Sequence, residues 1–146
     1  MLSRQASHAL KALLELAAHP QRRCSTHELA RARQLPEPML EQLLLRLRRA
    51  GLLEARRGRL GGYRLSRAAR DISLAAVLAA LGETPADPAG DPLTAATAAD
   101  QVTHALQQRL ERARQRALEE LSLEDLLFDL RSAEASQGGE AGLLLG

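Results

Sequence analysis

Apolar residues near the start of the chain recur at helical spacing. Alanines and leucines three and four positions apart run through residues 4–18, and Pro20 ends this first predicted helix. Ser25 is followed three positions later by Glu28, which is typical of a capping box and predicts that a short second helix begins there.

A third helix is predicted from the run "LPEPMLEQLLLRLRRAG". Either Pro36 or Pro38 suits its first turn, and Gly51 suits the position after its last turn. One side of this helix is a leucine stripe that we expect to face the core, formed by Leu40, Leu43, Leu44 and Leu47.

Two short strand patterns follow, at residues 52–56 and 63–65, around a glycine-rich bend. They predict a β-hairpin. The run "DISLAAVLAALG" then predicts a helix that begins at Asp71 or Ser73 and ends at Gly82. A helix, a helix–turn–helix pair and a hairpin follow one another in the order of a winged helix-turn-helix, in which the hairpin is the wing.

The C-terminal half predicts one long helix over residues 94–121. Its apolar residues lie on one face, at Val102, Leu106, Leu110, Ala113, Ala117 and Leu121. Ser122 with Asp125 resembles another capping box and predicts a short final helix. A helix with one apolar face and no further core to cover needs a partner, so we expect this face to form a dimer interface.

The predicted fold is therefore mainly α with a small β-hairpin wing, followed by a long C-terminal dimerisation helix. Residues 1–82 form the winged helix-turn-helix domain, residues 83–93 a loop rich in Pro, Gly and Asp, and residues 94–131 the dimerisation helices. Residues 132–146 are small, polar and glycine-rich, and we expect them to be disordered.

Charge is divided unevenly between the two halves. Residues 1–70 hold fifteen Lys and Arg against five Asp and Glu, whereas residues 71–146 hold five against thirteen. The basic half is typical of a protein that meets a polyanion. Single-stranded RNA readers stack bases on aromatic side chains, and only 1% of this chain is aromatic, so duplex DNA is the expected partner.

The remaining composition indicates a cytoplasmic protein. No apolar run reaches the length needed to span a bilayer, and the amphipathic start does not resemble a signal peptide. The chain has a single cysteine, which excludes an internal disulfide framework. We find no paired carboxylates, no nucleophile with its base and no phosphate loop, so no enzymatic activity is predicted.

The third helix presents a candidate reading face opposite its leucine stripe. Glu41 and Gln42 lie there with basic neighbours, and such residues can contact base edges in the major groove. Four arginines around the glycine-rich bend would lie near a second groove or the DNA backbone. An ordinary solvated face, with Glu41 paired to a nearby Arg, is the alternative.

Several motifs together resemble the Rrf-two (Rrf2) family of bacterial transcription regulators. These are "LEQLL.RLR.AGL" at 40–52, "RG..GGY.L" at 57–65, "I.L..V..AL.E" at 72–83 and "LSLEDLL" at 121–127. The resemblance implies a homodimeric winged-helix repressor or activator that binds double-stranded DNA, with a palindromic operator and with long helices that cross between the two subunits.

The same resemblance implies which residues touch DNA. Glu41 and Arg57 match the family's base readers, and Gln42 is a neighbouring candidate. Contacts with the DNA backbone, or a role in the wing, are expected at Arg4, Ser25, Thr26, Arg46, Arg49, Gly58, Arg59, Gly61, Gly62 and Tyr63.

Many members of the family sense iron, nitric oxide or redox state through an iron–sulfur cluster held by three cysteines before the long helix. This chain has no cysteine there. Clusters are held by thiolates, so we expect no cofactor and no metal site. His104 matches a histidine that accompanies those cysteines in one branch, but it lies nearly opposite Val102 and is interpreted as facing solvent.

Three alternatives remain open. Cys24 lies before the second helix beside Arg22 and Arg23, which would lower its thiol pKa and suit a redox sensor; an incidental cysteine is the other interpretation. An unusual cluster involving His104 is a further hypothesis. The chain could instead be a protein-interaction adaptor that keeps the fold. A small-molecule effector or a protein partner is left open.

Overall fold

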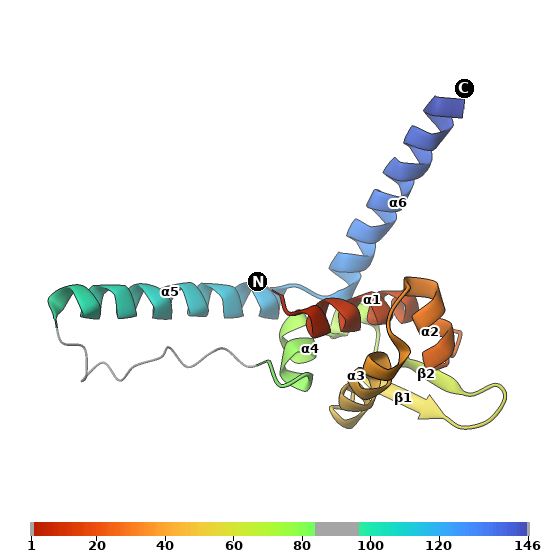
Figure 1. The fold of residues 1–146 in the computed structure, drawn as a ribbon, viewed down its shortest axis with the longest axis horizontal. Helices are drawn as coiled ribbons and strands as arrows, with labels where there is room; N and C mark the ends of the chain where they lie inside the picture. The colour runs from red at the N-terminus through yellow and green to blue at the C-terminus, as the bar shows by residue number, and fades with distance from the viewer. Residues whose placement is uncertain (1, 84–96, 146) are drawn as a thin grey trace.

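The computed structural model describes residues 2–83 and 97–145 (Figure 1). In chain order it contains α1 (Arg4–Ala18), α2 (Thr26–Arg33), α3 (Glu37–Arg49), β1 (Leu53–Arg56), β2 (Gly62–Leu65), the short 3-10 helix η1 (Ala69–Asp71), α4 (Leu74–Ala80), α5 (Ala98–Glu120) and α6 (Leu123–Leu145). This order confirms the predicted winged helix-turn-helix with a hairpin and a long C-terminal helix.

Leucine and alanine side chains fill the core, because the sequence offers almost no aromatic residues. The predicted stripe of α3 is buried, with Leu40, Leu43, Leu44 and Leu47 between 0% and 2% exposed. Burying a leucine stabilises a fold by about 1.5–3 kcal/mol relative to leaving it exposed. This stripe therefore anchors α3 with its opposite face turned outward.

Serine side chains cap the N-termini of helices at or near the predicted positions. The Ser25 hydroxyl accepts a hydrogen bond from the Glu28 backbone N–H at 3.1 Å, and the Glu28 carboxylate accepts one from the Ser25 N–H at 3.2 Å. This is the predicted capping box. Ser73, rather than Asp71, caps α4, since Asp71 lies in the η1 turn.

The hairpin is joined by a third extended segment. Strands β1 and β2 are antiparallel, with the partners Leu53↔Leu65, Glu54↔Arg64, Ala55↔Tyr63 and Arg56↔Gly62. On the other side of β2, Cys24 N–H donates to the Tyr63 carbonyl at 2.9 Å, and Tyr63 N–H donates to the Cys24 carbonyl at 2.7 Å. The segment before α2 thus holds the hairpin against the helix–turn–helix pair.

Helix α5 forms an arm that begins far from the core and runs back to it, so that its last residues meet the core and α6 follows (Figure 1). Ser73 and Ser122 form an isolated β-bridge, in which Leu74 N–H donates to the Leu121 carbonyl and Leu123 N–H to the Ile72 carbonyl. None of the α5 residues is buried. The arm is therefore stabilised mainly at its base, where it meets α4.

Two predicted boundaries differ from the structure. Residues 132–145 continue α6 as a helix rather than a disordered tail, because a helix already packed at its start extends without a new nucleation cost. Leu123 is fully buried in the core of residues 1–82, so α6 begins within that unit and packs on α1 and η1. Except for Glu83, the predicted 83–93 loop lies outside the described residues.

Within residues 2–83 and 97–145, no helix combines the length and apolar character needed to cross a bilayer.

Replacing Gly62 with alanine should loosen the hairpin. Gly62 has φ +128°, and a Cβ there would lie 2.6 Å from the Cys24 carbonyl atoms. Gly51, with φ +82°, has open space around it. Gly51→Ala should cost about 1–2 kcal/mol of stability from its backbone alone. Gly62→Ala should cost about 2–4 kcal/mol because the clash adds to the backbone strain. Urea unfolding measures both; equal losses would contradict the close approach.

Candidate nucleic-acid interface

The outward face of α3 carries polar and basic side chains. Glu41 and Gln42 are exposed, and so are Arg48 and Arg49 in the last turn. Leu45 is 38% exposed on the same side. The structure thus brings both predicted base readers of α3 to the surface, where a groove could receive them.

Contacts at both ends fix the direction of α3. In the turn before it, Gln34 adopts φ +54°. His27 Nδ1 of α2 lies 3.1 Å from the Glu37 carboxylate at the start of α3. Near its end, Arg46 Nη1 donates to the Leu81 carbonyl at 3.4 Å. Arg46 was predicted to contact the DNA backbone, and in this chain part of its guanidinium instead caps the end of α4.

The tip of the hairpin is a tight turn. Gly61 N–H donates to the Gly58 carbonyl at 3.0 Å, and Gly58 has φ +107°. A Cβ on Gly61 would lie 2.1 Å from the Arg56 carbonyl oxygen. Gly61 and Gly62 are needed here because other backbone segments of the chain pass too close to leave room for a Cβ. Arg59 and Leu60 project from the tip, and Leu60 is 90% exposed, an apolar feature that the sequence analysis did not single out.

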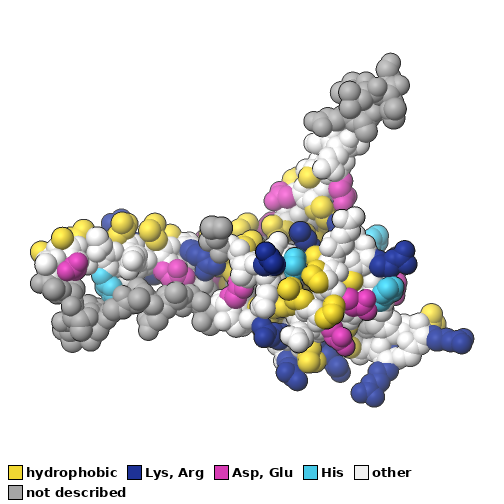
Figure 2. All heavy atoms as spheres, viewed as in Figure 1, with side chains coloured by type: hydrophobic (Ala, Val, Ile, Leu, Met, Phe, Trp, Pro, Cys, Tyr) yellow, Lys and Arg dark blue, Asp and Glu magenta, His cyan; other side chains and the backbone are white. Residues whose placement is uncertain are grey.

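The hairpin arginines lack a full set of carboxylate partners. Arg64 pairs with Glu54 across the two strands at 3.0 Å. Arg56, Arg57 and Arg59 are exposed and form no ion pair with any residue that the structure describes. Figure 2 shows Lys and Arg side chains gathered along the edge formed by the helix–turn–helix part and the hairpin. This surface can accept a polyanion.

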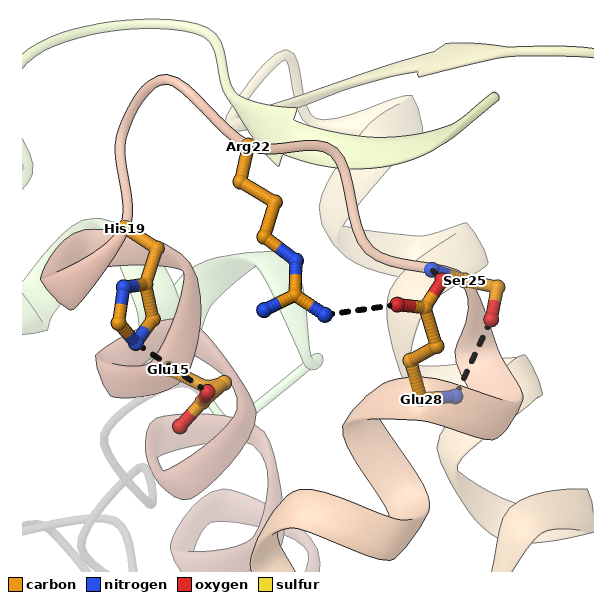
Figure 3. A network of polar contacts seen from close by, with 5 residues as sticks. All are labelled: Glu15, His19, Arg22, Ser25 and Glu28. Carbon is orange, nitrogen blue, oxygen red and sulfur yellow. Dashed lines mark hydrogen bonds and ion pairs between the residues drawn. The ribbon is translucent and has the colours of Figure 1, made fainter. Parts of the chain in front are cut away.

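A polar network orders the segment that leads into α2 (Figure 3). Arg22 donates to Glu28 at 3.0 Å, which raises the pKa of Arg22. Hydrogen bonds, first from the Ser25 N–H and then from Arg22, lower the pKa of Glu28. Glu15 of α1 forms an ion pair with Arg33 at 2.8 Å and lies 3.6 Å from His19. The Arg22–Glu28 pair thus holds the start of α2, and the Glu15–Arg33 pair ties the end of α2 to α1.

Two other predicted contact residues, Ser25 and Tyr63, have structural roles. The Ser25 hydroxyl caps α2 and keeps its hydrogen available to donate, and the next residue, Thr26, is half-buried. Tyr63 packs partly against the core rather than projecting from the hairpin. Arg4 is exposed in the first turn of α1, where Ser3 contacts Glu83 beyond the end of α4. Nothing in the structure links Arg4 to the hairpin.

Cys24 does not have the reactive environment that the sequence predicts. Its side chain is 3% exposed, and burial raises the pKa of the thiol although Arg22 acts in the opposite direction. The prediction of a lowered pKa is wrong because pairing with β2 turns this side chain into the core. The sequence signal, two adjacent arginines, says nothing about that long-range pairing.

His104 is half-buried rather than fully facing solvent. Its Nε2 is enclosed and has no hydrogen-bond partner in the part of the chain that is described. Across the same part, no three His, Cys, Asp or Glu side chains come close enough together to hold a metal ion.

The predicted apolar stripe of α5 lies at the surface of the single chain. Val102 is 69% exposed, Leu106 52%, Leu110 61% and Leu121 41%, and Ala113 and Ala117 are exposed between them. Figure 2 shows hydrophobic side chains along one edge of this arm. Phe128 of α6 is 71% exposed and extends the set of exposed apolar residues. Phe128 lies outside the apolar periodicity of α5, so that pattern does not predict its exposure.

A family model described as "Iron-dependent Transcriptional regulator", Rrf2, matches residues 2–129. The chain belongs to the Rrf2 family. It is 40% identical over 140 residues to slr0846 of Synechocystis sp., which carries the name of an HTH-type transcriptional regulator, and 94% of each chain is covered. This chain is therefore a transcriptional regulator of the Rrf2 family.

Solved structures of Rrf2-type regulators share the fold. The structure titled "T. potens IscR" has a TM-score of 0.74 at 29% identity, covering 91% of this chain and 90% of that one. CymR, titled as the global cysteine regulator of B. subtilis, has a TM-score of 0.72 at 27% identity, covering 87% and 95%. The shared architecture extends beyond the winged domain into the C-terminal helices.

The description of the family raises the question of iron. A thiolate-held cluster needs several cysteines, and this sequence has only Cys24, which is buried and paired in the backbone bridge to β2. The residues of this Rrf2 chain therefore do not fit an iron–sulfur cluster.

Alkylation of Cys24 tests its burial. The Cys24 thiol should react with iodoacetamide far more slowly in native protein than in urea. Because burial raises its pKa, the reaction rate of native protein should keep rising with pH after the rate of an ordinary thiol has reached its plateau. An exposed cysteine at Gln137→Cys in a Cys24→Ala background serves as the control. Mass spectrometry follows both, and equal native rates would contradict the buried site.

Proposed function

We propose that this Rrf2 regulator is a homodimer that binds a palindromic operator in duplex DNA and represses transcription from it. The observation that carries the proposal is the outward face of α3, with Glu41 and Gln42, beside a hairpin whose tip arginines have no carboxylate partner among the described residues. Glu can accept from cytosine N4, and Gln can bond adenine in a bidentate manner. A dimer seated on its operator excludes other proteins, which favours repression.

The arm supports a dimer. Four large apolar side chains of α5 and its end are between 41% and 69% exposed on one side of a helix that buries none of its own residues. An apolar surface of this kind is stabilised when a second copy covers it. The arrangement favours α5 packing against its equivalent in the partner subunit.

Operator binding is proposed to be independent of an iron–sulfur cluster. The chain offers a cluster only one thiol, that of Cys24, and burial raises the pKa of this thiol. Regulation then passes through another signal, either a small molecule or a protein partner. No catalytic step is part of this proposal.

Replacing Arg57 with alanine tests base recognition. If Arg57 reads a base, the variant should lose about 1–3 kcal/mol of operator affinity and relax sequence preference at one base pair in each half-site. Competition binding to single-substituted duplexes measures this. Arg131→Ala on α6, with the same loss of charge, should behave as the wild type.

An equal loss of affinity for every duplex would show that Arg57 contacts a phosphate and not a base. A wild-type protein that binds no operator, together with unchanged binding of a protein partner in Arg57→Ala, would favour the adaptor instead.

Introducing a charge into the α5 stripe tests the dimer. Leu110→Glu should shift the protein to monomer because an unpaired carboxylate would be buried in an apolar interface. Gln101→Glu adds the same charge on the opposite side of the helix and should stay dimeric. Sedimentation velocity distinguishes the two, and a dimeric Leu110→Glu protein would contradict the proposed interface.

A further inference from the structure

The hairpin and the segment before α2 form a small three-stranded surface with two distinct faces. Because Cys24 pairs with Tyr63 and Tyr63 with Ala55, these three residues share one face, which is turned toward the core. Side chains alternate along a strand, so the neighbouring rows lie on the opposite, solvent-facing side. One row is Arg23, Arg64 and Glu54, and the next is Ser25, Gly62 and Arg56.

This outer face gathers three arginines around a bare glycine. Arg64 and Arg56 are exposed and Arg23 is half-buried. Gly62, between Ser25 and Arg56, adds no side chain to this face, because the Cys24 and Ser25 backbone occupies the place of a Cβ. Glu54 is the carboxylate on these rows, and it is paired with Arg64 at 3.0 Å. The surface therefore keeps an excess of two positive charges.

The charged form of Arg23 is destabilised by its surroundings. Partial burial and then the nearby charges of Arg64 and Arg56 lower its pKa. Its Nη1 is enclosed and has no hydrogen-bond partner among the residues that the structure describes. A guanidinium that is poorly solvated and repelled by its neighbours is stabilised by an anion that accepts its hydrogen bonds.

We propose that Arg23, Arg56 and the Ser25 hydroxyl form a binding site for one phosphate of the DNA backbone, seated over Gly62. Arginine binds phosphate through paired N–H groups, and the Ser25 hydroxyl can donate while its oxygen still accepts from Glu28. Arg56 leads directly into Arg57, so a duplex that reaches the hairpin tip passes this surface. The inference rests on the proposed function, since the ligand is the backbone of the operator duplex.

The salt dependence of operator binding tests this site in the full-length protein. Each phosphate contact contributes about 0.9 to the slope of log affinity against log salt. Arg23→Ala should reduce the slope by about 0.9 per bound subunit and weaken binding to operator and scrambled duplex by the same factor. Arg23→Lys should retain the slope because the charge remains.

Arg131→Ala is the control, because it removes the same charge from an exposed position on α6. Its slope should equal that of the wild type. Equal slopes for Arg23→Ala and Arg131→Ala, on a wild-type protein that binds its operator, would overturn the phosphate site alone. A wild-type protein without any salt-dependent DNA binding would overturn both this site and the proposed function.

Discussion

The backbone bridge between Cys24 and Tyr63 is the constraint on which the proposed DNA-binding surface depends. A two-stranded hairpin is marginally stable by itself in water. Here β2 is paired on both sides, with β1 and with the segment before α2, through two backbone hydrogen bonds of 2.9 and 2.7 Å. Gly62 is required at this crossing because any Cβ would meet the Cys24 backbone. The bridge sets the hairpin relative to α2, and the leucine stripe sets α3 relative to the same core, so both reading elements share one rigid support.

The second constraint is the anchoring of the chain at the C-terminal end of α5. The Ser73–Ser122 bridge places Leu123 in the core and leaves α5 as an arm whose apolar side is uncovered. With 23 residues, the arm is about 34 Å long at 1.5 Å per residue. In the proposed dimer, a second subunit covers the apolar side of this arm.

Local signals predicted most of the fold. Ser25 with Glu28 and Ser122 with Asp125 gave the starts of α2 and α6, and the glycine-rich bend gave the hairpin, because caps and turns depend on neighbouring residues. The environment of Cys24 could not be predicted, since its burial results from pairing with a strand about forty positions away. For the same reason the contact of Arg46 with α4 and the crowding of Arg23 by Arg56 and Arg64 were not visible in the sequence.

The most direct test of the account is selection of operator sequences from random duplex DNA by chelator-treated, metal-free protein. The account predicts enrichment of one palindromic sequence with two half-sites about one helical turn apart, because α3 and the hairpin read DNA without a cluster. Enrichment of no sequence by the folded dimer, or enrichment only after iron is restored, would contradict it.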